Sequence, residues 1–178
     1  MKKSRIILIG IVIVIILLLV SGIGTHNDLV SKSENIGTAF SQIDNQLQRR
    51  NDLIPNLVET VKRYAEHEND VFTDIADARA KLAGAGNLTE QAKGDAALTN
   101  ALSRLIAIAE NYPELKANQN FIQLQDELAG TENRIAAARK DYNEAARDYN
   151  TSIRRFPTNL YANILGFEKA DYFEALKR

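Results

Sequence analysis

The adjacent His67 and Glu68 are the residues of this chain whose types most directly suggest chemistry. A histidine followed by a glutamate begins the zinc-protease pattern H-E-x-x-H, in which two histidines four positions apart on one helix bind the metal. In this chain the position of the second histidine holds Val71. The only other histidine, His26, lies two residues after an apolar segment that ends at Gly24, so no second imidazole completes a zinc site. We therefore expect no metal and no cofactor.

Other catalytic patterns fail on spacing in the same way. A di-iron centre in a helical bundle needs a Glu-x-x-His pair on each of two helices, but position 64 is Tyr and residues 117–156 hold no histidine. A G-x-S-x-G serine elbow is absent, and Gly84-Ala85-Gly86 lacks the following Lys-Ser/Thr of a phosphate-binding loop. The sequence therefore predicts no enzymatic activity.

Composition limits the class of protein further. The chain has 178 residues, of which 25% are charged and 45% hydrophobic, which suits one domain plus one anchor. Its formal net charge of −1 gives no electrostatic footprint for nucleic acid. The absence of cysteine leaves no residue for a disulfide, a thiolate metal ligand or a cysteine nucleophile.

The N-terminal segment predicts a membrane anchor over residues 1–24. Ile6–Gly24 spans 19 residues without a charge, which is close to the length that crosses a bilayer core. A cleavable signal peptide ending near Val20-Ser21-Gly22 is the alternative. Lys2, Lys3 and Arg5 precede the span, so the positive-inside rule places the N-terminus in the cytoplasm and the main domain outside it.

Apolar residues at helical spacing predict an all-α protein beyond this anchor, in the form of an elongated antiparallel four-helix up-down-up-down bundle over residues 25–156. The expected helices cover about residues 25–50, 53–83, 95–111 and 117–156. Asp52 would cap the second helix, with Pro55 in its first turn, and the stretch Gly84–Gly94 would be a loop.

A heptad row in the last of these helices indicates coiled-coil packing. Its members are large residues spaced by seven: Phe121, Leu128, Ile135, Tyr142, Tyr149 and Phe156. The row beside it becomes smaller along the helix, so large residues of the seam would pack against small ones.

Short motifs distributed along nearly the whole chain resemble the LemA family of small single-span bacterial membrane proteins. They are residues 46–58 (QLQRRNDLIPNLV), His67-Glu68, Ala78-Arg79, residues 110–118 (ENYPELKAN), Phe121, Leu124, Leu128, Glu132, Ala138-Arg139, Tyr142-Asn143, Tyr149-Asn150 and Phe156-Pro157. The resemblance implies an N-terminal anchor, a helical bundle and no established enzymatic activity. It also implies membrane metalloproteases or other envelope proteins as partners.

Two polar pairs are candidates for fixing the register of the bundle. Glu68 shares an apolar row with Ile54 and Val61, so we expect it to be buried and paired with Arg134. Arg79 would lie near Asn143 at a matching height. A ligand or partner site at these four residues is the alternative.

Five further residues are expected to cluster at the end of the bundle far from the membrane: Arg49, Arg50, Glu110, Tyr112 and Glu114. The two arginines would either complete the C-terminus of the first bundle helix or form part of a partner-binding surface.

The tail over residues 157–178 is rich in aromatic side chains, namely Tyr161, Phe167, Tyr172 and Phe173. Aromatic residues that return to the membrane side are candidates for the lipid interface, and capping of the open end of the bundle is the alternative.

The sequence favours a membrane-anchored, non-enzymatic helical scaffold that forms homo-oligomers or docks onto other membrane proteins. An accessory subunit or adaptor of a membrane protease or envelope quality-control system is the alternative. A small-ligand sensor bundle is the second alternative.

Overall fold

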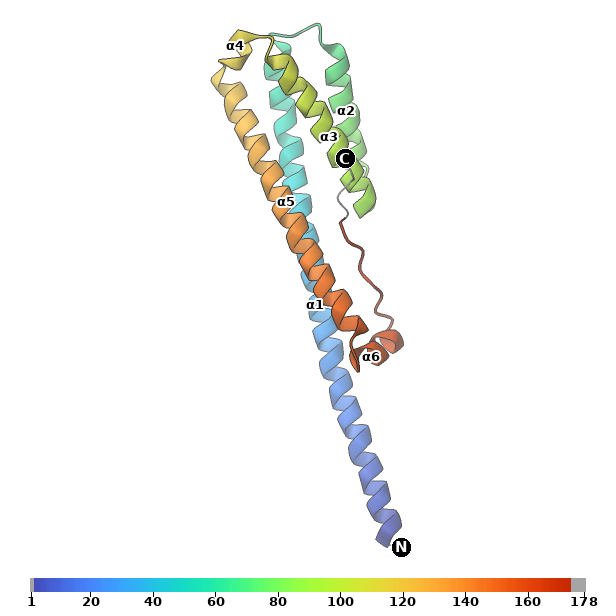
Figure 1. Ribbon diagram of the computed structural model, residues 1–178. Coiled ribbons are helices and arrows are strands. Elements are labelled where there is room, and N and C mark those ends of the chain that lie inside the picture. Colours follow the sequence, from blue (N-terminus) through green and yellow to red (C-terminus); the bar gives the residue numbers. More distant parts are fainter. Residues whose placement is uncertain (1, 174–178) are drawn as a thin grey trace. The chain divides into compact units, whose positions relative to one another are not determined.

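The computed structural model describes residues 2–173, apart from the side chains of residues 2–6, 14 and 18. The prediction of an all-α chain with a long apolar N-terminal helix is confirmed, because this range contains helices and no strand (Figure 1). The helices are α1 (Lys2–Lys62), α2 (Asn69–Ala83), α3 (Leu88–Ala109), α4 (Pro113–Lys116), α5 (Gln119–Arg154) and α6 (Thr158–Leu165). The last five residues of the predicted tail, 174–178, lie outside the described range.

Two compact units make up the described range. The bundle unit consists of residues 40–141 together with Phe173, and the anchor unit consists of residues 2–39 and 142–172. The long helices α1 and α5 each contribute one part to both units.

The bundle unit is built around one apolar core. α1, α2, α3 and α5 all contribute side chains to it, and residues such as Leu57, Ile75 and Leu105 are completely or almost completely buried. α2 and α3 lie side by side in Figure 1. Their close approach requires Gly94, because a Cβ atom there would lie only 2.8 Å from the Cα of Leu82. Burial of this apolar surface is the main force that holds these helices together.

The predicted helix boundary near Asp52 is wrong, because α1 continues through Pro55 to Lys62. A proline inside a helix costs about 3 kcal/mol. Ile54, Leu57 and Val61 are each fully buried in the core, and each such burial contributes about 1.5–3 kcal/mol. The apolar row therefore outweighs the proline, and the chain turns only at residues 63–68, before α2 begins.

The third predicted helix starts seven residues too late. α3 begins at Leu88 because Asn87 and Glu90 form reciprocal caps: the Asn87 side chain accepts a hydrogen bond from Glu90 N at 2.9 Å, and the Glu90 carboxylate accepts one from Gly86 N at 2.8 Å. The Gly86 N–H and then the Asn87 side chain hold the pKa of Glu90 below its usual value. The predicted loop Gly84–Gly94 therefore shrinks to residues 84–87.

The anchor unit has a much smaller core. Leu29 of α1, Tyr149 of α5 and Ala162 of α6 form it, with Phe167 packed against them. The segment after α6 is held by Asn150, whose side-chain amide donates to Ala170 O and accepts from Ala170 N, both at 2.8 Å. The hydroxyl of Tyr142 donates to Asp171 O at 3.0 Å. Side-chain hydrogen bonds from Asn150 and Tyr142, together with the packing of Phe167, therefore fix the path of residues 166–172.

α1 also carries the one candidate membrane span within residues 2–173. Its apolar N-terminal part has a mean hydropathy of 3.2 over eighteen residues, and none of that window is buried inside the protein. Exposed side chains such as Ile9, Leu17 and Ile23 surround this part of the helix. A helix of this length and composition is suited to a lipid environment on all sides.

Candidate functional site

Four charged residues of the bundle unit form an ion network around the buried Arg50 and Asp95. Arg50 of α1 donates to the Oδ1 atom of Asp95 in α3 at 2.8 Å, and Arg139 of α5 donates to its Oδ2 atom at 2.8 Å. The side chains of Arg50 and Asp95 are only 3% and 7% exposed. A carboxylate oxygen of Glu132 lies 3.9 Å from Arg50 and adds a second negative charge. The network joins three helices of the bundle at one level.

This network suits a structural role better than a catalytic one. Both carboxylate oxygens of Asp95 already accept a hydrogen bond from a guanidinium group, so this carboxylate is fully engaged. The guanidinium of Arg139 also lies 4.5 Å from the centre of the Phe173 ring, in a cation–π contact. Buried charges are stable only when paired in this way, and a specific pairing fixes which helices meet and in which register.

The sequence reasoning missed this network, although a signal for it is present. Arg50 lies seven residues from both Ile43 and Leu57, so it occupies a position in a buried row of α1. Asp95 lies three residues before Leu98 on the buried face of α3. A charge at a core position of an amphipathic helix indicates that the charge has a buried partner. Which residue that partner is can be determined only from the tertiary fold.

The five residues predicted to cluster at the distal end do not form one group. Arg49 and Arg50 lie inside α1 and not at a helix end, because α1 continues to Lys62. Arg49 is exposed with a Glu127 oxygen 4.0 Å away, while Arg50 is buried. Glu110, which follows α3, pairs with Lys116 on the surface. Tyr112 packs against the core, and Glu114 is exposed in α4.

The four residues of the two predicted register pairs have different environments. Glu68 lies in the turn before α2 and is half-buried, while Arg134 is exposed on α5. Arg79 of α2 donates to Asn51 of α1 at 2.9 Å. Asn143 belongs to the anchor unit and is half-buried there. The prediction placed the turn between the first two bundle helices near Asp52. Because α1 continues past Pro55 to Lys62, residues of α1 and α2 lie at other positions along the bundle than predicted, and their expected partners change.

His67, the residue that suggested metal chemistry, is exposed in the same turn. Across the residues that the structure describes, no group of three or more His, Cys, Asp or Glu side chains is arranged to hold a metal ion.

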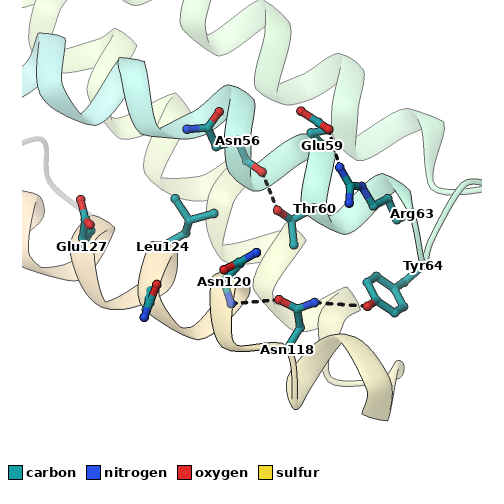
Figure 2. A pocket seen from close by; sticks show the side chains of 10 residues that line it. Asn56, Glu59, Thr60, Arg63, Tyr64, Asn118, Asn120, Leu124 and Glu127 are labelled. Carbon is teal, nitrogen blue, oxygen red and sulfur yellow. Dashed lines mark hydrogen bonds and ion pairs between the residues drawn. The ribbon is translucent and has the colours of Figure 1, made fainter.

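An open polar groove on the bundle unit is the better candidate for contact with another molecule (Figure 2). It has a volume of about 380 Å³ and lies between the end of α1 and the start of α5. Its walls carry mostly amide, hydroxyl and charged side chains: Asn56, Glu59, Thr60, Arg63, Tyr64, Asn118, Asn120, Gln123, Leu124 and Glu127.

One end of this groove is fixed by Asn118. Its side-chain oxygen accepts hydrogen bonds from Asn120 N at 2.9 Å and Phe121 N at 3.2 Å, which caps α5, and its Nδ2 atom donates to the Tyr64 hydroxyl at 3.2 Å (Figure 2). Arg63 donates to Glu59 at 2.6 Å along the α1 wall. The side-chain amides of Asn56, Asn120 and Gln123 have no hydrogen-bond partner among residues 2–173, so they offer both donors and acceptors to solvent.

The four predicted interface aromatics have different environments. Phe173 is buried beneath Arg139 in the bundle unit. In the anchor unit, Tyr161 packs on Gly22 and the Phe167 ring lies 5.7 Å from that of His26. Tyr172 is exposed, with the Lys169 ammonium 5.6 Å from its ring centre. All four side chains therefore make contacts within the protein, and Tyr172 is the one that stays exposed.

Known proteins with similar sequences lead to one family. The magnetosome protein MamQ 2 of Paramagnetospirillum magneticum is 31% identical over 175 aligned residues, which cover 84% of this chain and 64% of that protein. MamQ of Magnetospirillum gryphiswaldense is 27% identical over 83% of this chain and 64% of its own length. Protein LemA of Metamycoplasma hominis is 27% identical, with coverage of 86% and 70%.

The chain thus spans slightly less than two thirds of the length of its magnetosome relatives. The family model for LemA matches residues 39–178, which is most of the sequence. The chain therefore belongs to the LemA family.

Proposed function

We propose that this protein is a membrane-anchored, non-enzymatic helical scaffold that binds a polypeptide segment of another membrane protein in the groove between α1 and α5. The observation that carries the proposal is the set of open amides on a fixed wall, at Asn56, Asn120 and Gln123. A primary amide offers two donors and a carbonyl acceptor, which match the alternating N–H and C=O groups of an extended backbone. In the proposed topology, the apolar part of α1 spans the inner membrane with the bundle outside the cytoplasm.

Rigidity of the groove walls supports the same proposal. The groove is bounded by α1 and α5, and both helices are tied to α3 through Arg50, Asp95 and Arg139. Binding to a preorganised surface avoids the entropic cost of ordering that surface on contact. The buried network thus contributes to binding indirectly, by holding the helices that carry the amides.

The names of similar proteins also support a structural role. The MamQ relatives are named as magnetosome proteins. We extend to this chain only the general expectation of a part in a membrane assembly. Self-assembly is the special case in which the bound segment comes from a second copy.

A photo-crosslinking experiment tests the proposal. A photoreactive amino acid at Gln123 in the groove should crosslink to a discrete partner in intact cells, whereas the same amino acid at the exposed Ala76 of α2 should not. Replacement of Asn56 and Asn120 by alanine should abolish the crosslink without changing the far-UV circular dichroism. Equal crosslinking from both positions, or none from either, would contradict a specific groove.

Native mass spectrometry after extraction in a mild detergent distinguishes a self-assembling scaffold from a docking scaffold and from the two alternative functions. A homo-oligomer indicates a self-assembling scaffold, and a different co-purifying membrane protein indicates docking. A co-purifying protease would favour the accessory-subunit alternative. A monomer that retains only a small molecule would favour a ligand sensor and would overturn the scaffold.

A further inference from the structure

The short helix α6 of the anchor unit presents an apolar surface to solvent. Leu160, Ile164 and Leu165 are 53%, 82% and 47% exposed, and Phe156 just before the helix is 81% exposed. Leu160 and Ile164 lie four residues apart, so they occupy the same face of α6. The opposite face contains Ala162, which is buried in the core of the unit. α6 is eight residues long and carries apolar side chains on both its buried and its exposed side. Contact with water does not stabilise the exposed apolar side, so this side is expected to be covered by another apolar surface.

The position of α6 within its unit indicates what covers this surface. Tyr161, Ile164 and Leu165 line an apolar groove of about 350 Å³ together with residues of α1: Leu19, Gly22, Ile23 and His26. Leu19, Gly22 and Ile23 belong to the last turns of the candidate membrane span, and His26 begins the polar part of α1. The surface of α6 is therefore continuous with the exposed apolar surface of the span and lies where that span ends.

Charge on the neighbouring residues agrees with a membrane surface. Arg154 and Arg155 are exposed at the end of α5, immediately before Phe156. Guanidinium groups next to an apolar patch are suited to lipid phosphates, while the apolar side chains enter the acyl region. A bulky aromatic and aliphatic surface flanked by basic residues is the composition of helices that lie in the membrane interface.

We propose that α6 and Phe156 form an interfacial lipid-binding site, in which Phe156, Leu160 and Ile164 insert into the leaflet at the end of the α1 span. The occupant is a phospholipid, with an acyl chain in the groove between α1 and α6 and its phosphate near Arg154 and Arg155. The site gives the protein a second membrane contact beside the span itself. It does not depend on the groove of the bundle unit or on which side of the membrane the bundle lies.

The natural absence of cysteine makes depth measurements with single-cysteine variants direct. We would reconstitute the full chain in vesicles of phosphatidylethanolamine and phosphatidylglycerol, with an environment-sensitive fluorophore on Ile164→Cys. The reference for full insertion is Ile13→Cys in the span, and the reference for exposure is Asp148→Cys on the exposed surface of α5. Lipids spin-labelled near the headgroup end of the acyl chain, and iodide in the water, are the two quenchers.

The expected result is several-fold stronger quenching by the spin-labelled lipid at position 164 than at position 148, with little quenching by iodide. This pattern should persist when the protein is diluted in lipid, and Leu160→Glu should weaken it while the helical content stays unchanged. Iodide quenching of the label at 164 equal to that at 148 would overturn the proposal. Shielding from both quenchers would overturn it as well, since it would mean that a second copy or the protein itself covers α6; dependence on protein density would identify the second copy.

Discussion

The bundle unit and the anchor unit are stabilised in different ways. In the bundle unit, side chains buried in the core, such as Leu57, Leu98 and Leu105, accompany an ion network in which Arg50 and Arg139 both pair with Asp95. The guanidinium Nε atoms of Arg50 and Arg139 are buried without a hydrogen-bond partner. In the anchor unit, a few buried side chains around Leu29 are supplemented by hydrogen bonds from Asn150 and Tyr142.

This difference shows that the two units depend on their surroundings to different degrees. The bundle unit excludes water from its own core, so its stability should respond to core packing and charge pairing. The anchor unit leaves large apolar side chains exposed, so it depends on an environment that covers them. Substitutions in the first unit should therefore unfold it globally, and substitutions in the second should release segments locally.

The largest expected effect is from Asp95→Ala. This change leaves Arg50 buried with an uncompensated charge, and loss of one partner from a buried ion pair costs about 3–5 kcal/mol. Urea unfolding of the detergent-solubilised full chain, followed by far-UV circular dichroism, measures it. Asp77→Ala on the exposed surface of α2 is the control. A combined Arg50→Met and Asp95→Leu variant should recover most of the lost stability. If neither Asp95→Ala nor the combined variant differs from the parent protein in its free energy of unfolding, the network has no role in stability.

The next effect compares two glycines, one in each unit. A Cβ at Gly94 would lie 2.8 Å from the backbone of Leu82, so Gly94→Ala should push α2 away from α3 and cost about 1–3 kcal/mol. A Cβ at Gly22 would lie 3.1 Å from the ring of Tyr161, a side chain that can move. Both variants gain helix propensity of about 1 kcal/mol, which leaves the net effect of Gly22→Ala near zero and offsets only part of the cost at Gly94. Thermal melts of both variants test this; a larger loss from Gly22→Ala would reverse the comparison.

A smaller and local effect is expected from Asn150→Ala. It removes both hydrogen bonds to Ala170 and should weaken the hold on residues 166–172 by about 1–2 kcal/mol. Hydrogen–deuterium exchange should become faster at Ala170 while amides of α2 and α3 keep their protection. Asn163→Ala, on the exposed part of α6, provides the matched control. Faster exchange throughout the bundle unit would show that the two units do not respond separately.

The smallest expected effect is a loss of stability of the anchor unit at alkaline pH. Burial raises the pKa of Tyr142 and Tyr149, and the carboxylates of Asp171 and Glu168 raise them further. Folding therefore favours the protonated phenols. Their contribution is fully present below the unfolded pKa of about 10 and is lost as the pH rises through the higher folded values.

The rate of amide hydrogen–deuterium exchange at residues 166–172, corrected for the intrinsic exchange rate, should thus stay constant from neutral pH up to about pH 10. Above that pH the corrected rate should increase. In a Tyr142→Phe, Tyr149→Phe variant this pH-dependent increase should vanish. An increase that begins well below the unfolded pKa would point to a different titrating group.

Several features of the fold are predictable from residue spacing because they depend on local periodicity. The buried row Phe121, Leu128 and Ile135 follows directly from the heptad pattern of α5. The same pattern fails at Phe156, which is 81% exposed because α5 ends at Arg154. The helix cap at Asn87 was missed, although an asparagine followed three residues later by glutamate is a capping signal within the predicted loop.

The sequence by itself determined the all-α class, the apolar N-terminal helix and the membership of the LemA family, since helical periodicity, hydropathy and residue identity are properties of neighbouring positions. Only the tertiary structure decided that α1 passes through Pro55 and that Arg50 meets Asp95 and Arg139. The physical reason is that a local preference for a helix end near Pro55 competes with the burial of side chains whose partners are far away in the chain. That balance can be evaluated only when those partners are in place.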